Sequence, residues 1–75
     1  MEIIINLVHD TIMYNKESKH GTLKSGLFGA EDFSIHERAF TTTVDFEIDL
    51  GDRTSVWSYP CKFTDHGNRL VVTVE

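Results

Sequence analysis

This 75-residue chain has four histidines and a single cysteine, the side chains that could bind a metal ion or take part in nucleophilic catalysis. They are His9, His20, His36, His66 and Cys61. Three of the histidines adjoin an Asp or a Glu, but adjacent residues of a strand point to opposite faces, so no such dipeptide can chelate a metal. The sequence has no His-x-x-x-His pair and no cysteine pair at zinc spacing. We therefore expect turn and surface histidines and no metal site; a small metal protein or enzyme built from distant histidines is the weaker alternative.

Nucleophilic catalysis has little support in the sequence. Cys61 follows Pro60 and shares its strand face with aromatic residues, where a free cysteine behaves as a small core hydrophobe. No Gly-x-Ser-x-Gly elbow and no phosphate-binding glycine loop occurs. We expect a protein that is not an enzyme and needs no cofactor.

A row of acidic residues is the best functional lead. Asp45, Glu47 and Asp49 alternate with apolar residues along 43–50, and Asp52 extends the charge into the following turn. A period of two places the apolar set on one side of a strand and the three carboxylates on the other. The apolar set is Val44, Phe46, Ile48 and Leu50. No Lys or Arg lies between Thr43 and Asp52 to compensate the charge.

The spacing of this row limits what it can imitate. Carboxylates on alternate residues lie about 6.8 Å apart, whereas one DNA strand carries a phosphate about every 3.4 Å. Imitation of nucleic acid would need further carboxylates, for which Glu2, Glu37 and Glu75 are the candidates, brought alongside by folding or by dimerisation. The competing interpretation is a plain solvated face that discourages aggregation.

Aromatic residues form a second candidate surface. Trp57, Tyr59 and Phe63 fall on one face of a predicted strand with Arg53 and Lys62 nearby, as on folds that stack single-stranded bases. The favoured interpretation is that these rings belong to the core, because a chain this small has little other apolar area to bury.

Composition restricts the partners. The formal net charge is −5, from twelve acidic and seven basic residues, which disfavours direct binding of DNA or RNA and favours a basic protein partner.

A lone cysteine excludes an internal disulfide. The first residues lack a basic leader, and their apolar run is too short for a signal or membrane segment. We expect a cytoplasmic protein that does not bind membranes.

The elements that must position these residues are mainly strands in one domain, 1–75. The pattern predicts an all-β or β-rich α+β fold: an antiparallel meander of five or six strands closing as a barrel or sandwich. The predicted strands are 2–8, 11–17, 22–28, 40–50, 55–63 and 69–75. One short helix is favoured near 30–38, against a strand in which Phe33 alternates with Ile35. Pro60 predicts an edge or a bulge in its strand.

Together these features favour a non-catalytic acidic binding module that docks on a basic, nucleic-acid-binding protein surface and inhibits it. Asp45, Glu47, Asp49 and Asp52 are its expected contact residues. Small size and negative charge fit an inhibitor from a phage or mobile element. A structural homo-oligomer that pairs through strand edges, with a homodimer as its simplest form, is the alternative.

Overall fold

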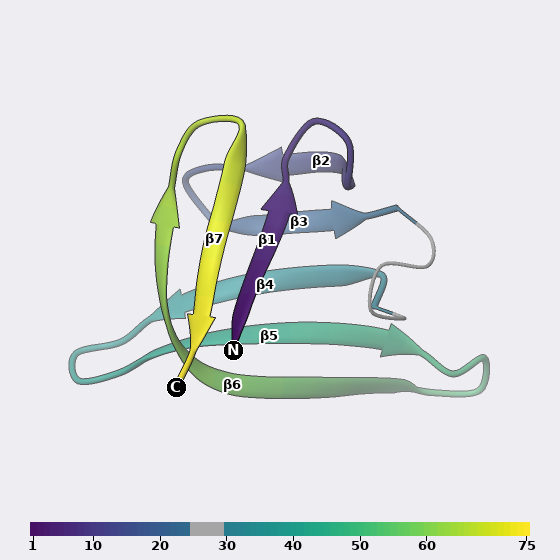
Figure 1. Cartoon of the computed structure of the whole chain (residues 1–75). Helices are drawn as coiled ribbons and strands as arrows, with labels where there is room; N and C mark the ends of the chain where they lie inside the picture. Colours follow the sequence, from purple (N-terminus) through teal and green to yellow (C-terminus); the bar gives the residue numbers. More distant parts are fainter. Residues whose placement is uncertain (25–29) are drawn as a thin grey trace.

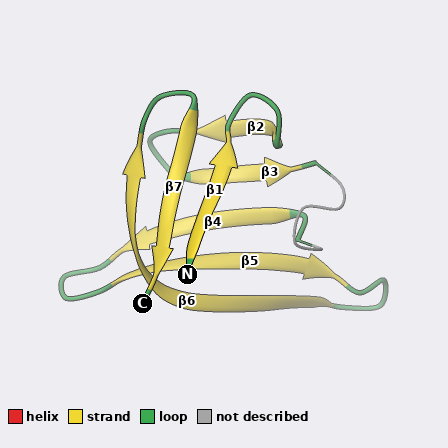
Figure 2. Ribbon diagram, viewed as in Figure 1, coloured by secondary structure: helices red, strands yellow, loops and turns green. Residues whose placement is uncertain are grey.

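Seven antiparallel strands are the regular elements among the residues that the structure describes (Figures 1 and 2). The computed structural model describes residues 1–24 and 30–75. The strands are β1 (Glu2–Asn6), β2 (Thr11–Asn15), β3 (His20–Leu23), β4 (Asp32–Glu37), β5 (Thr42–Asp49), β6 (Thr54–Asp65) and β7 (Arg69–Val74). The all-β class is confirmed, and the count is one or two strands higher than expected. The predicted strand 22–28 continues into residues 25–29, which lie outside the described residues.

The additional strand is β4, and the helix expected near residues 30–38 is wrong. Phe33 and Ile35 are buried on one side of β4, while its outward residues alternate with them. β3 and β5 pair with the two edges of this segment. Its peptide groups are therefore satisfied in an extended conformation, and no strong N-cap residue favours a helix.

The strands lie in the order β1-β7-β6-β5-β4-β3-β2, and every neighbouring pair is antiparallel. β6 holds the sheet together because it has two successive partners. Its residues 54–60 pair with β5, and its residues 61–65 pair with β7. The sheet bends where the partner changes, and it curls into a half-barrel whose termini lie close together (Figure 1).

Pro60 lies at this bend. Of the edge or bulge predicted there, the edge is wrong, because β6 lies in the interior of the strand order. The Pro60 carbonyl accepts a hydrogen bond from the Glu75 amide at 2.9 Å. Its backbone polar groups therefore face β7 rather than β5. The missing N–H removes no hydrogen bond from the β5–β6 ladder, which is why proline is tolerated here.

The core lies inside the curl of the sheet. Its buried members are Ile3, Ile5, Leu23, Ala30, Phe33, Ile35, Val44, Phe46, Cys61, Leu70 and Val72. Phe33 stacks on Tyr14 with 5.7 Å between ring centroids, and it covers Gly21 on the neighbouring strand. A Cβ at position 21 would overlap the Phe33 ring, so this close approach requires glycine.

β2 departs from simple alternation. The sequence places Ile12 and Tyr14 on one face, but Ile12 is 70% exposed and Tyr14 is half-buried against Phe33. The cause is a register shift between Thr11 and Met13 against β3, since an extra residue in one strand resets which way the following side chains point.

Asparagine or aspartate at a strand end starts four of the turns. The side-chain oxygens of Asn6, Asn15, Asp49 and Asp65 each accept a hydrogen bond from a backbone amide two residues ahead. Such local hydrogen bonds compete with strand pairing and fix where the turns begin.

Candidate binding surfaces

The acidic row lies where the alternation places it. Val44 and Phe46 are buried on the inner side of β5, and Asp45, Glu47 and Asp49 point to the solvent side. Asp52 is exposed in the turn between β5 and β6. The expected polarity is thus confirmed from Val44 to Asp49, whereas Leu50, predicted on the apolar face, lies beyond the end of β5 and is 51% exposed.

The fold adds a fourth carboxylate that the sequence pattern did not indicate. Asp32, assigned to the start of a helix in the sequence interpretation, lies on β4 directly opposite Glu47. Opposite residues of an antiparallel pair project to the same side of the sheet. We call Asp32, Asp45, Glu47 and Asp49 the acidic face. Only the register of β4 against β5 reveals it, because 15 positions separate Asp32 from Glu47.

Two of the four carboxylates have partners within the fold. Asp45 lies 3.2 Å from the Nε2 atom of His36 and accepts a hydrogen bond from the Ser58 hydroxyl. Asp49 accepts the Gly51 amide at 2.7 Å and so supports the turn that follows β5. These two residues have structural roles whether or not the face binds a partner.

Asp32 and Glu47 differ from them. Among the described residues, neither side chain makes a hydrogen bond or an ion pair. They face each other as like charges; opposite residues of an antiparallel pair have Cβ atoms about 5 Å apart, and two unit charges at that distance repel by about 0.8 kcal/mol even at the dielectric constant of water. Like charges directly opposite on a sheet destabilise it. The fold therefore carries an electrostatic cost at this pair that no described partner offsets.

The other carboxylates proposed to join the row lie elsewhere. Glu37 pairs with Lys19 at 3.1 Å, and Glu75 with Lys62 at 3.9 Å. Glu2 stands on β1, which pairs with β7 rather than with β5. None of the three reinforces the acidic face as an unpaired charge.

The histidines do not converge. His9 and His66 lie in turns, while His20 and His36 lie on β3 and β4. In the described part of the chain, no three His, Cys, Asp or Glu side chains are placed to share a metal ion. His20 Nδ1 is 2.8 Å from the Ser34 hydroxyl, but the carboxylate of Asp45 contacts the other histidine, His36. The Ser-His-Asp relay of hydrolases is therefore not formed by these residues.

Cys61 is buried in the core, as expected for a small hydrophobe. Burial raises the pKa of its thiol above the usual value, and the negative charges of Glu75 and Asp45 raise the pKa further. The thiolate that a nucleophile requires is thereby disfavoured.

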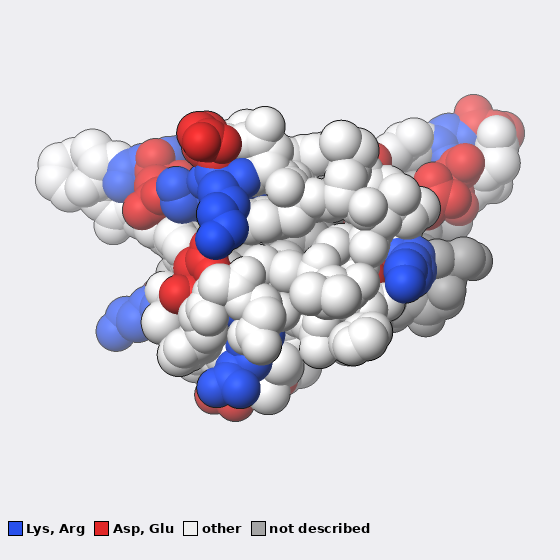
Figure 3. Space-filling model, turned by 90° about the horizontal axis from the view of Figure 1, so that it is seen from above, with Lys and Arg blue, Asp and Glu red and all other residues white. Residues whose placement is uncertain are grey.

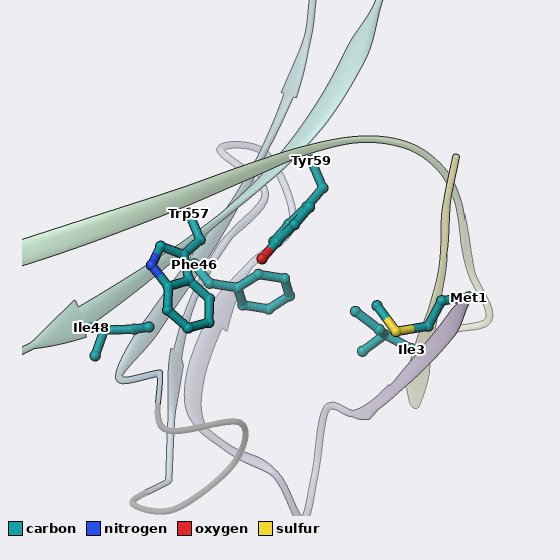
Figure 4. A pocket seen from close by; sticks show the side chains of 6 residues that line it. All are labelled: Met1, Ile3, Phe46, Ile48, Trp57 and Tyr59. Atoms are coloured by element: carbon teal, nitrogen blue, oxygen red, sulfur yellow. The ribbon is translucent and has the colours of Figure 1, made fainter.

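An apolar cleft opens between the two parts of the curled sheet. It encloses about 230 Å³ and is lined by Met1, Ile3, Phe46, Ile48, Trp57 and Tyr59. Figure 4 shows the side chains from β5 and β6 along one wall and Met1 with Ile3 on the other. Tyr59 and Phe63 pack against the core as predicted, but Trp57 is 51% exposed, so its assignment to the core is wrong.

The charged residues are unevenly distributed over the surface. Seen from above, over β2 and the turns at the top of Figure 1, a broad area lacks Lys, Arg, Asp and Glu, and the charged groups lie around its margin (Figure 3). Val8, Ile12 and Met13 are exposed apolar residues of β2 and the turn before it. No helix among residues 1–24 and 30–75 is long and apolar enough to cross a membrane.

No protein-family model, curated protein or solved structure matches this chain. Function is therefore inferred from the geometry of the acidic face and the apolar cleft alone.

Proposed function

We propose that this protein is a non-catalytic module that docks its acidic face on a basic protein surface, of the type that binds nucleic acid, and blocks it. The observation that carries the proposal is the position of Asp32 opposite Glu47 across β4 and β5, two like charges for which the described residues provide no partner. A basic partner would supply the cations that the described residues do not, and would turn a destabilising pair into a binding determinant.

The density of charge supports the same conclusion. From Asp45 to Asp49 the row extends about 14 Å, over which one DNA strand carries about four to five phosphates. With Asp32 included, the acidic face presents four carboxylates over that length. β4 thus raises the count over this length from three carboxylates to four, against the about four to five phosphates of one DNA strand. A groove that accepts one nucleic-acid strand is the matching partner surface.

The test uses affinity capture from a lysate of the cell that makes the protein. The wild type is compared with the double variant Asp32→Asn/Glu47→Gln, which removes two charges from the acidic face. We expect the wild type to retain a basic protein that high salt or added DNA releases, and the double variant to lose it.

A matched control separates the effect of charge on the acidic face from the effect of the protein's net charge. The variant Glu2→Gln/Glu17→Gln changes the net charge by the same amount at exposed positions outside the acidic face, on β1 and in the turn between β2 and β3. It should retain the partner like the wild type. If both double variants bind equally, or if capture is insensitive to salt and to DNA, the acidic face is not the docking surface.

A further inference from the structure

β1 stands at one end of the strand order, so one of its edges faces no strand of the described sheet (Figure 1). On its other edge, the Val74 amide donates to the Met1 carbonyl at 2.7 Å, and the Met1 nitrogen donates to the Val74 carbonyl at 3.3 Å. Such bonded pairs occur at every second residue of an antiparallel ladder. The backbone N–H and C=O groups of Glu2, Ile4 and Asn6 therefore point away from β7, toward the outer edge.

The outer edge of β1 is occupied at one end and open at the other. The Asn6 amide donates to the Asp10 carboxylate at 2.8 Å, and the Asn6 carbonyl accepts the Asp10 amide at 2.8 Å. The outward backbone groups of Glu2 and Ile4 make no hydrogen bond with any described residue. The open edge thus consists of the N–H and C=O groups of these two residues, and Asp10 limits its length.

The sequence of β1 does little to protect this edge. Its register with β7 is regular from Glu2 to Asn6, and it contains neither proline nor lysine. Its three consecutive isoleucines favour an extended backbone, and the side chain of Ile4 is 55% exposed. β2, at the other end of the strand order, carries a register shift, which discourages pairing. Because proteins cover or disrupt bare edges, β1 is the edge at which we expect a partner strand.

The open edge is complementary to itself in one antiparallel register. When Glu2 lies opposite Ile4 of a second copy, the two residues exchange both hydrogen bonds, and the symmetric pair does the same. All the open backbone groups of both edges are then used, in four hydrogen bonds. A register with Ile4 opposite Ile4 sets Glu2 against the occupied Asn6 and keeps only two of these bonds. A register with Glu2 opposite Glu2 also keeps two, and it opposes like charges.

We propose that two copies of this chain pair through the outer edges of β1, with Glu2 of each copy opposite Ile4 of the other. On the inner side, Ile3 then meets Ile3 of the second copy, next to the apolar cleft that Ile3 lines. The same surface is used by both copies, so the contact closes on itself and stops at a dimer. It goes beyond the proposed function, since it uses no residue of the acidic face.

The response to salt distinguishes this dimer from the proposed function. The interface is small, and both copies carry a net charge of −5, so the dimer is of the transient kind. Added salt screens the repulsion between the two copies and should strengthen their association. Docking of the acidic face on a basic partner should instead weaken as salt is added, so failure of one proposal leaves the other intact.

The first test is a cross-link that only the proposed register permits. The variants Glu2→Cys and Ile4→Cys, both at exposed positions, are mixed and treated with oxidised glutathione. Opposite residues of a hydrogen-bonded pair have Cα atoms about 5.5 Å apart, within the range of a disulfide, whereas two copies of one position lie diagonally, about 7–8 Å apart. We expect a covalent dimer from the mixture on a non-reducing gel and none from either variant alone. Glu2→Cys mixed with Val56→Cys, which is 52% exposed on β6, is the control and should give no dimer.

The second test removes a hydrogen-bond donor from the edge. Ile4→Pro deletes an N–H that faces away from β7, so the β1–β7 ladder keeps its bonds, and circular dichroism checks that the variant is folded. In light scattering from about 1 µM to about 1 mM, the wild type should increase in mass to that of a dimer and no further. Ile4→Pro should associate at least about tenfold more weakly, because two of the four hydrogen bonds are lost. Ile4→Val keeps the N–H and should associate like the wild type.

Four outcomes would overturn the proposal. They are a wild type that stays monomeric over this range, a folded Ile4→Pro variant that associates as strongly as Ile4→Val, association that weakens with added salt, and an Ile4→Cys variant that cross-links alone as well as in the mixture.

Discussion

The two sides of the β4–β5 pair are built from alternate residues of the same strands, yet they have opposite effects on the stability of the fold. On the inner side, Phe33, Val44 and Phe46 lie in the core. On the outer side, Asp32 and Glu47 oppose each other without a described partner. The inner side stabilises the protein by removing apolar area from water, whereas the outer side costs stability. Substitutions on the two sides should therefore have effects of opposite sign.

Phe33→Ala is the largest test of this comparison. It removes a ring that is 0% exposed, stacks on Tyr14 and covers Gly21. We expect a loss of about 3–5 kcal/mol in the free energy of unfolding, measured by urea denaturation. That is a large part of the stability of so small a domain, so circular dichroism without denaturant should already show a partly unfolded population. A loss below about 1 kcal/mol would mean that the core does not depend on this ring.

Asp32→Asn, one residue before Phe33, should change stability in the opposite direction. It removes one member of the like-charged pair with Glu47, and we expect a gain of about 0.2–1 kcal/mol in the same urea experiment. The gain should shrink as salt is added, since screening weakens the repulsion that the substitution relieves.

Asp52→Asn is the control, because Asp52 is exposed in a turn and has no facing carboxylate on a paired strand. Its effect should lie within about 0.5 kcal/mol of zero. Destabilisation by Asp32→Asn would show that the Asp32 carboxylate has a favourable role that its described surroundings do not explain.

Alkaline pH sharpens the comparison because it acts on two ionisable groups, Tyr14 and Cys61, in or against the core to which the inner side of β4 and β5 belongs. Burial, and then the charge of Asp65, raise the pKa of Tyr14, and burial is also the main cause of the raised pKa of Cys61. Between the ordinary and the raised pKa, the folded protein keeps protons that the unfolded chain releases. Stability should therefore hold below about pH 8.5 and fall as the pH rises through the raised pKa values.

Urea midpoints measured from pH 7 to pH 11 test this expectation. In Tyr14→Phe the decline above about pH 9.5 should be shallower, because the titrating hydroxyl is gone. An equal decline in wild type and variant would assign the alkaline sensitivity to other groups.

Much of the candidate site could be predicted from residues that lie close together in the chain. The polarity of β5 could be predicted because side chains of a strand alternate whatever the strand pairs with. The turns at Asn15, Asp49 and Asp65 depend equally on local hydrogen bonds. The conformation of β4 was harder to predict because the segment has only six residues. The spacing of Phe33, Glu37 and Phe40 suits a helix, while that of Phe33 and Ile35 suits a strand.

The chain alone thus determined which side chains of β5 share a face, with apolar residues inward and carboxylates outward, and it indicated a core of isoleucine, valine and phenylalanine. Only the tertiary structure decided which faces meet. It set Asp32 beside Glu47, turned β6 at Pro60 toward a second partner, and left Trp57 at the mouth of a cleft. The reason is physical: side-chain direction follows from the local backbone, but the register between strands is settled by the packing of the whole core.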